Sequence, residues 1–228
     1  MRRKPLLVSF SGIDGAGKST QISRLCDTLR QAGLRVKLIA FWDDVAQLKS
    51  FREDVGHKVF GGDLGVGTPE APIRRRDKNV QSPLLTLFRM AIYVVDALSL
   101  RWVVRDALQP SSGIDVAIFD RYIYDELANV NLQNAPTRFY VRILMRLVPR
   151  PDLAFILDAD PNAAFARKPE YPLDFLHANR SSYLDLSRKI GGITVIPPLS
   201  IDEVQAEILQ RVMDKKNALL PHGWDSRA

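Results

Sequence analysis

The stretch that decides the fold is Leu6-Leu7-Val8-Ser9-Phe10-Ser11-Gly12-Ile13-Asp14-Gly15-Ala16-Gly17-Lys18-Ser19-Thr20. Its first six residues form an apolar run typical of a buried strand, and the residues after Lys18 are expected to form a helix. Between them lies the pattern G-x-x-x-x-G-K-[ST], which is a phosphate-binding loop (P-loop) when it joins a strand to a helix. The glycines let several backbone N–H groups point into one cavity, which the positive end of the helix dipole also faces. The stretch therefore predicts a nucleoside triphosphate site.

Individual P-loop positions have expected roles. Lys18 is expected to reach the β- and γ-phosphates, and the Ser19 hydroxyl to bind Mg²⁺. The triphosphate, taken to be that of ATP, is expected to contact these further residues: Gly12, Gly15, Ala16, Gly17 and Thr20. A glycine-rich turn without a ligand is the alternative, and the strand-to-helix context disfavours it.

Strand and helix patterns alternate along the rest of the chain, as in a parallel sheet with crossover helices. We expect strands at 6–11, 36–41, 116–119, 153–157 and 194–196. We expect helices at 18–32, 82–108, 122–132, 136–147, 173–189 and 201–217, and one that begins at Pro161. The predicted fold is α/β, a three-layer sandwich of the P-loop NTPase type with a central parallel sheet of about five strands and helices on both faces.

Residues 42–81 are irregular and rich in glycine and proline, and we interpret them as an insertion. Within them, the run Arg74-Arg75-Arg76-Asp77-Lys78 is either a solvated basic loop, which we favour, or a patch that faces phosphate. No domain linker is evident, so we expect a single domain over residues 1–228.

Composition narrows the class of protein. The chain has 228 residues, enough to bury a core without disulfides, and its one cysteine, Cys26, fits a reducing compartment. No run of about 18 apolar residues occurs, so we expect no membrane span and a cytoplasmic location. The net charge of +6 could attract nucleic acid. No zinc-ligand spacing or aromatic RNA signature accompanies it, and polyphosphate ligands suit the same excess, so we expect no nucleic acid partner.

A second candidate site, Asp120-Arg121-Tyr122, follows the strand predicted at 116–119. Open α/β sheets bind ligands at the carboxyl ends of their strands, so these residues are expected to face the triphosphate. Arg121 can clamp phosphate oxygens, and Asp120 can hold Mg²⁺ through water or orient the arginine. A surface ion pair is the alternative, which the nearby P-loop makes the weaker interpretation.

These motifs resemble those of the thymidylate kinase family of nucleoside monophosphate kinases. The family's phosphate loop reads approximately G-x-[DE]-G-x-G-K-[ST]-T, which residues 12–20 match, and its strand-end D-R-[YFHS] motif is matched by residues 120–122. Family members also carry a strand ending in L-D, a helix that starts at proline, a basic lid and a D-F…R…Y pattern. This chain has the matching residues Leu157-Asp158, Pro161, Arg167-Lys168, Asp174-Phe175, Arg180 and Tyr183. The resemblance covers most of the chain apart from roughly residues 42–95.

The resemblance implies transfer of the γ-phosphoryl group of ATP, with Mg²⁺, to a nucleoside monophosphate such as dTMP. It places Asp14 near the sugar and phosphate of the acceptor, and it makes a homodimer plausible. Because this P-loop contains no arginine, a basic lid residue is needed from residues 167–173. We favour Arg167, whereas Lys168 is equally well explained as a favourable charge at a helix end.

Two departures from the family pattern concern the acceptor. The family's R-E-P-G-G-type segment is replaced by Phe41-Trp42-Asp43-Asp44, and Asp96 lies where the family has an arginine near the base. A nucleoside or another small molecule is therefore an alternative acceptor, with Asp43 or Asp44 as a general base. A nucleotide-binding protein without catalysis is a second alternative.

The expected site has three parts. The catalytic residues are Asp14, Lys18, Arg121 and Arg167. The acceptor-binding residues are Asp14, Trp42, Asp43, Asp120, Arg121 and Tyr122. The metal-binding residues are Ser19 and Asp120.

Overall fold

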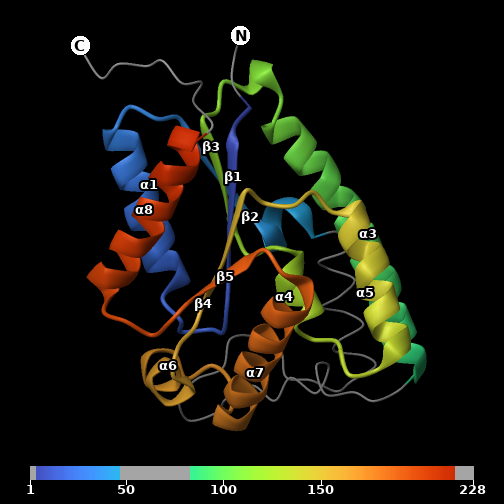
Figure 1. Ribbon diagram of the computed structural model, residues 1–228. Helices are drawn as coiled ribbons and strands as arrows, with labels where there is room; N and C mark the ends of the chain where they lie inside the picture. The colour runs from blue at the N-terminus through green and yellow to red at the C-terminus, as the bar shows by residue number, and fades with distance from the viewer. Residues whose placement is uncertain (1–3, 47–82, 219–228) are drawn as a thin grey trace.

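A five-stranded parallel sheet lies at the centre of the computed structural model, which describes residues 4–46 and 83–218 (Figure 1). The strand order is β2-β3-β1-β4-β5. The strands are β1 (Leu6–Ser11), β2 (Val36–Ala40), β3 (Val116–Asp120), β4 (Leu153–Leu157) and β5 (Ile193–Ile196). This architecture confirms the predicted α/β fold with five parallel strands.

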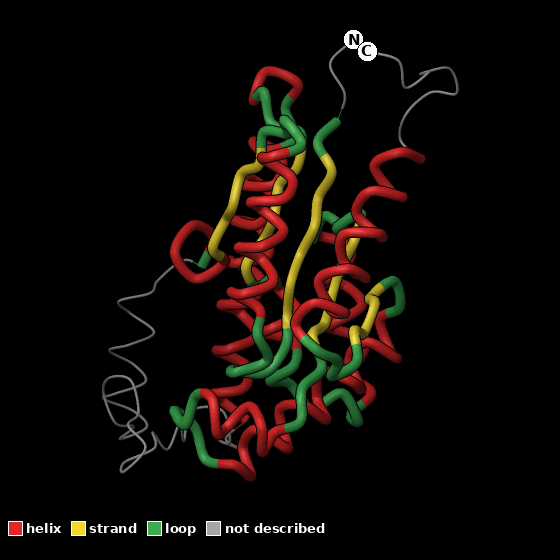
Figure 2. Tube along the Cα trace, turned by 90° about the vertical axis from the view of Figure 1, so that its left-hand side faces the viewer, coloured by secondary structure: helices red, strands yellow, loops and turns green. Residues whose placement is uncertain are grey.

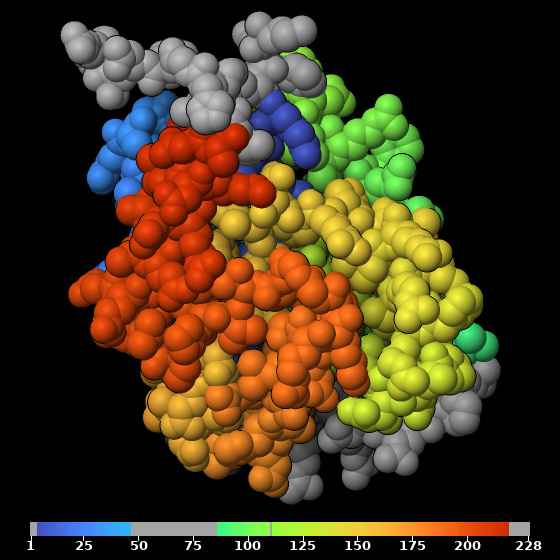
Figure 3. Space-filling model, in the orientation of Figure 1, coloured from blue at the N-terminus to red at the C-terminus, as the bar shows by residue number. Residues whose placement is uncertain are grey.

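Helices cover both faces of the sheet, as Figure 2 shows from the side. The helices are α1 (Lys18–Gln31), α3 (Pro83–Ala107), α4 (Ile123–Leu127), α5 (Ala135–Leu147), α6 (Pro161–Arg167), α7 (Leu173–Ile190) and α8 (Ile201–Ala218). Helices α1 and α8 share one hydrophobic core with the sheet, and α3, α4, α5 and α7 share the other. Figure 3 shows the outer surfaces of α5, α7 and α8, which hide most of the sheet in this view.

Strand β1 illustrates why the sheet is buried on both sides. All six of its residues are buried, as expected for a central strand of a parallel sheet. Leu6, Val8 and Phe10 face the core of α1 and α8, whereas Leu7 faces the opposite core. The ring of Phe10 packs against that of Phe155 on β4, with centroids 5.4 Å apart. The apolar run in the sequence therefore contributes side chains to the hydrophobic cores on both faces of the sheet.

The segment after β2 differs from the predicted strand 36–41. The strand ends at Ala40, and Phe41–Val45 form a π-helical turn. The backbone N–H of Ala40 donates to Asp44 Oδ2 at 2.7 Å, and that of Ala46 donates to the carbonyl of Phe41 at 2.8 Å, so the turn is closed by two hydrogen bonds.

One further predicted helix is shorter in the structure, and the predicted insertion lies mostly outside the described residues. The helix predicted at 122–132 is shorter, because α4 ends at Leu127 and a loop continues to α5. Of the insertion predicted at 42–81, the structure describes only residues 42–46, so the Arg74–Lys78 run lies outside the described residues. Among the helices that are described, none has both the length and the apolar character needed to cross a membrane.

All five strands run in the same direction, so their carboxyl ends meet at one edge of the sheet. This edge lies at the bottom of Figure 1, where β1 leads into the P-loop and β3 into Arg121. The registers pair Phe10 with Asp120, and Asp120 with Ala40. The edge thus brings the predicted motifs of residues 12–20 and 120–122 next to each other.

Candidate active site

The P-loop curves tightly because its glycines adopt backbone angles that other residues avoid. Gly12 has a φ of 138°, and a Cβ atom there would lie 2.5 Å from the carbonyl oxygen of Leu157. Gly15 has a φ of 80°, and its Cβ would lie 2.5 Å from the carbonyl oxygen of Ala164. The loop therefore packs directly against the backbone of β4 and α6, where only glycine fits.

The amino end of α1 is suited to an anion. Helix α1 begins after Gly17 without a hydrogen-bonding side-chain cap and without an acidic residue in its first turn. The first N–H groups of a helix have no acceptor within the helix and carry the positive end of its dipole. Ser19 and Thr20, in this first turn, are exposed. The residues present thus fit the triphosphate that the sequence predicted here.

Lys18 lies underneath this loop rather than in solvent. Its Nζ donates to the carbonyl oxygens of Gly12 at 2.8 Å and Ile13 at 2.9 Å. Burial, followed by the positive charge of Arg121, lowers the pKa of Lys18 from 10.5 to about 8. The ammonium group of Lys18 is thus buried beneath the loop and held by two of its carbonyls, at the position where the P-loop pattern expects a cation for phosphate oxygens.

Arg121 occupies a strained position at the end of β3. Its φ is 68°, in the left-handed region, and its backbone N–H donates to the carbonyl of Phe10 at 2.9 Å. Such a conformation costs a residue other than glycine about 1–3 kcal/mol, and it clusters at functional sites. The guanidinium donates to Asp14 of the P-loop and to Asp125, the latter at 3.0 Å. Although burial opposes its charge, these carboxylates raise the pKa of Arg121 above its ordinary value.

Asp125 was not among the predicted site residues, yet it holds Arg121 in place. Its carboxylate is buried and accepts hydrogen bonds from Ser11 Oγ at 2.6 Å and Tyr183 Oη at 2.8 Å. It also accepts from Arg121 Nη1 at 3.0 Å and from the backbone N–H of Tyr122 at 3.1 Å. The signal that could have revealed it is an acidic residue in the first turn of the helix after a strand-end arginine.

Asp120, the last residue of β3, lies at the same edge of the sheet. Burial raises its pKa, and the positive charges of Lys18 and Arg121 oppose that shift. The strand register places Asp120 opposite Phe10, one residue before Arg121. No group of three or more metal-ligating side chains occurs among residues 4–46 and 83–218. Mg²⁺ commonly binds through one or two carboxylates together with substrate phosphates, a mode that Asp120 and Ser19 fit.

The predicted lid contacts the P-loop through one of its two basic residues. Arg167, the last residue of α6, donates from Nε to the carbonyl oxygen of Gly15 at 3.0 Å. Lys168 instead pairs with Glu170 at 3.1 Å. Arg167 is therefore the lid cation that touches the loop.

Of the other predicted site residues, Tyr122 lies in the core, and Trp42 and Asp43 lie on the π-helical turn. Tyr122 is fully buried, and its hydroxyl donates to the carbonyl of Pro149 at 2.6 Å, so its side chain faces the core and not the acceptor. Trp42 is half-buried and packs edge-on against Phe41, with centroids 5.2 Å apart. Asp43 is exposed on the π-helical turn. The turn follows β2 directly, so Trp42 and Asp43 lie at the carboxyl-end edge of the sheet, the edge that also holds the P-loop and Arg121.

The hydrogen bonds around Arg121 lead to a stability prediction for two buried tyrosines. Tyr183→Phe removes a donor to the charged Asp125, and Tyr122→Phe removes a donor to a neutral carbonyl. We expect unfolding free energies to fall by about 1.5–3 kcal/mol and about 0.5–1.5 kcal/mol respectively, because bonds to charged groups contribute more. Urea denaturation of both variants measures the difference. Equal losses, or a larger loss for Tyr122→Phe, would show that Asp125 does not anchor this network.

The chain is similar to several curated proteins over most of its length. It is 24% identical over 213 residues to a probable thymidylate kinase of Archaeoglobus fulgidus, which covers 89% of this chain and 92% of the relative. It is 27% identical over 222 residues to a probable thymidylate kinase of Methanothermobacter thermautotrophicus, covering 95% of each chain. It is 29% identical over 192 residues to a thymidylate kinase of Bifidobacterium longum, covering 80% and 84%. No protein-family model matches the chain. The curated relatives confirm the predicted resemblance to the thymidylate kinase family, and with it the predicted enzyme class, a nucleotide kinase.

Proposed function

We propose that this chain transfers the γ-phosphoryl group of ATP to a deoxynucleoside monophosphate, with dTMP as the favoured acceptor and dTDP as the product. The observation that carries the proposal is the hydrogen bond between Arg121 and Asp14. It joins the strand-end arginine to the P-loop, so that a bidentate cation lies beside the triphosphate cradle. The similarity to thymidylate kinases over 80–95% of the chain supports the same acceptor.

Each residue of the site has its own role in phosphoryl transfer, a reaction that depends mainly on positioning and on neutralising charge. The P-loop N–H groups and Lys18 hold the triphosphate. Ser19 and Asp120 hold Mg²⁺, which neutralises charge on the phosphates when it is bound. Arg121 binds oxygens of the acceptor phosphate and of the transferred group, with Asp14 beside it. Arg167 brings a further positive charge to the P-loop.

The acceptor determines whether a general base is required. A nucleotide acceptor needs none, because its attacking phosphate oxygen is already anionic. A nucleoside presents a hydroxyl, which a carboxylate base would assist. Asp44 accepts the N–H of Ala40, and Asp43 is exposed beside it on the π-helical turn, so these two carboxylates are the candidate bases. Phosphorylation of a nucleoside, or of another small molecule that presents a hydroxyl, is therefore the second candidate function, with Asp43 or Asp44 as the base.

The decisive experiment is a panel assay. The purified chain is incubated with ATP, Mg²⁺ and each nucleoside or nucleoside monophosphate in turn, and ADP formation is followed. We expect turnover with dTMP. Turnover only with nucleosides would favour the second candidate, and ATP binding without any phosphorylated acceptor would indicate a non-catalytic nucleotide-binding protein.

Two variants test the catalytic assignments. Lys18→Ala is expected to abolish transfer, and Arg121→Ala to lower kcat by about 10²–10³-fold, the effect of removing one preorganised donor. Arg211→Ala is the matched control, because Arg211 lies on α8 and pairs only with Glu207 among the described residues. A near-normal rate for Arg121→Ala would mean that Arg121 does not face the reacting phosphates.

The lowered pKa of Lys18 predicts a pH dependence of ATP binding. Above a pH of about 8, Lys18 loses its charge in the free protein, whereas a bound triphosphate favours the charged form. Affinity should therefore fall as the pH rises through about 8, by up to about tenfold per pH unit, with proton uptake on binding. Isothermal titration calorimetry in buffers of different ionisation enthalpy measures both quantities. Lys18→Met should bind weakly and with no such slope; an unchanged wild-type affinity at high pH would contradict the prediction.

We also propose that the chain forms a homodimer, for which α3 offers a surface. Its exposed apolar side chains recur at helical spacing: Leu87, Val95, Leu98 and Trp102, the last 70% exposed. A stripe of this kind on a long helix is typical of a protein contact. Sedimentation analysis should show a dimer for the wild type and a monomer for Trp102→Glu. A monomeric wild type at micromolar concentration would contradict the proposal.

A further inference from the structure

Helix α7 carries two polar side chains, about one helical turn apart, that reach the ends of two different strands. Tyr183 donates to Asp125, in the helix that follows β3. Arg180 lies three residues earlier, on the same side of α7, and binds Asp158, the residue that directly follows β4. One helix is thus tied to the chain after β3 and to the chain after β4.

The ion pair between Arg180 and Asp158 is bidentate. Arg180 Nε donates to Asp158 Oδ1 at 2.6 Å, and Arg180 Nη2 donates to Asp158 Oδ2 at 2.7 Å. The side chain of Asp158 is 10% exposed, and the hydrogen bonds to it raise the pKa of Arg180 above its ordinary value. Two parallel hydrogen bonds fix an angle as well as a distance, which is the geometry in which a partly exposed ion pair holds its partners firmly.

Asp158 lies at the point where the chain leaves the sheet and enters α6. Its backbone N–H donates to the carbonyl oxygen of Ile196 on β5 at 2.9 Å, so the residue is also tied to the sheet. Two residues later, Asp160 caps α6, and its side chain accepts from the backbone N–H of Asn162 at 3.3 Å. Arg180 therefore joins α7 to the start of α6.

Helix α6 depends on such contacts for its position. It has seven residues, too few for a stable helix on its own, and its buried residues are Pro161 and Ala164. The carbonyl oxygen of Ala164 lies against Gly15, and α6 packs against α7 (Figure 1). At the other end of the helix, Arg167 donates to the carbonyl oxygen of Gly15 at 3.0 Å. Since the helix is only about 10 Å long, an anchor at its start determines where Arg167 lies.

We propose that Arg180 is a positioning residue for phosphoryl transfer, which holds the start of α6 so that Arg167 stays on the P-loop. The inference rests on the proposed function, because it takes Arg167 as the lid cation that faces the transferred group. Tyr183 supports the second cation, since its partner Asp125 binds Arg121. Helix α7 is then the common support of both arginines.

The variant Arg180→Met separates this role from a purely structural one. Methionine keeps part of the aliphatic stem and loses both hydrogen bonds to Asp158. We expect kcat to fall by about 10–100-fold, as when a reacting group is misplaced by about 1 Å, with the KM values for ATP and the acceptor unchanged. In an Arg167→Ala background the same substitution should change kcat by less than about twofold, because the two residues act through one contact.

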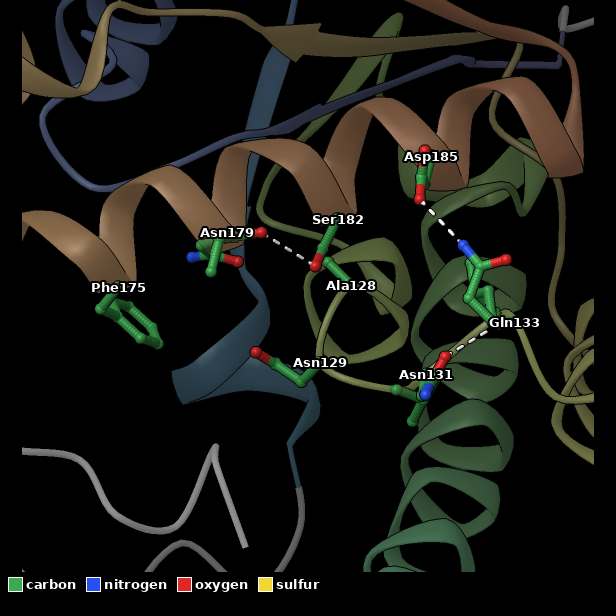
Figure 4. A pocket seen from close by; sticks show the side chains of 11 residues that line it. Ala128, Asn129, Asn131, Gln133, Phe175, Asn179, Ser182 and Asp185 are labelled. Atoms are coloured by element: carbon green, nitrogen blue, oxygen red, sulfur yellow. Dashed lines mark hydrogen bonds between the residues drawn. The ribbon is translucent and has the colours of Figure 1, made fainter. Parts of the chain in front are cut away.

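Two further variants serve as controls. Arg180→Lys keeps the charge but cannot form the bidentate pair, so its kcat should lie between those of the wild type and Arg180→Met. Arg188 also lies on α7 but pairs with Asp185 of the same helix, on the side that borders a cavity against the loop after α4 (Figure 4). Arg188→Met therefore breaks an ion pair without releasing α7 from another element, and it should change neither kcat nor KM.

Hydrogen exchange adds a readout that does not require turnover. The backbone N–H groups of Ala164 and Lys168 donate to the carbonyls of Asp160 and Ala164, each at 2.9 Å. We expect both to exchange about tenfold faster in Arg180→Met, the effect of losing a hydrogen bond to a charged group, and at the wild-type rate in Arg188→Met. The amides of α1 should be unchanged in both variants.

The outcomes distinguish this inference from the proposed function. A wild type that is inactive with every acceptor would overturn the proposed function, and faster exchange in α6 would still support Arg180 as the residue that positions Arg167. Unchanged exchange in α6 of Arg180→Met would overturn the inference whatever the activity. An equal loss of kcat with and without Arg167 would also overturn it, since Arg180 would then act through general stability.

Discussion

The charge of Arg121, shared between Asp14 and Asp125, is the interaction on which the rest of the candidate site depends. One carboxylate belongs to the P-loop after β1, and the other to the helix after β3. A guanidinium group can serve both at once because its donors point in fixed directions in one plane. Removing either carboxylate would leave a buried charge with half of its compensation. The ion pairs thereby fix the P-loop and the start of α4 relative to each other.

The sheet register makes this pairing possible. Strand β1 pairs with β3 so that Phe10 lies opposite Asp120, and the backbone N–H of Arg121 donates to Phe10. A one-residue slip would turn Arg121 to the other face of the sheet. The left-handed backbone of Arg121 is maintained because two hydrogen bonds to Asp125, from Arg121 Nη1 and from the backbone N–H of Tyr122, oppose its relaxation. A strained residue with partners on β1, the P-loop and α4 is preorganised, which is the property that electrostatic catalysis requires.

Much of the fold and part of the site could be predicted from residue patterns, for identifiable reasons. The P-loop and the Asp120-Arg121 pair are local motifs at strand ends, and a parallel sheet brings such ends together whatever the loops do. Asp125 could not be found in this way, because its importance lies in hydrogen bonds to residues that are far apart in the sequence, Ser11 and Tyr183. The interpretation of Tyr122 as an acceptor ligand was not supported by its orientation, since motif membership does not specify which way a side chain points. The π-helical turn at Phe41–Val45 escaped prediction because a side chain, Asp44, caps it locally.

The distribution of charge separates a cationic edge from the buried network that supports it. Cations gather at the P-loop edge, where Lys18, Arg121 and Arg167 lie, and the buried carboxylate of Asp125 compensates Arg121 from the side of the core. Such an edge suits the negative charge of a polyphosphate. Because Asp125 is itself held by Ser11 and Tyr183, the position of the Arg121 cation is set by the fold and not by a flexible side chain.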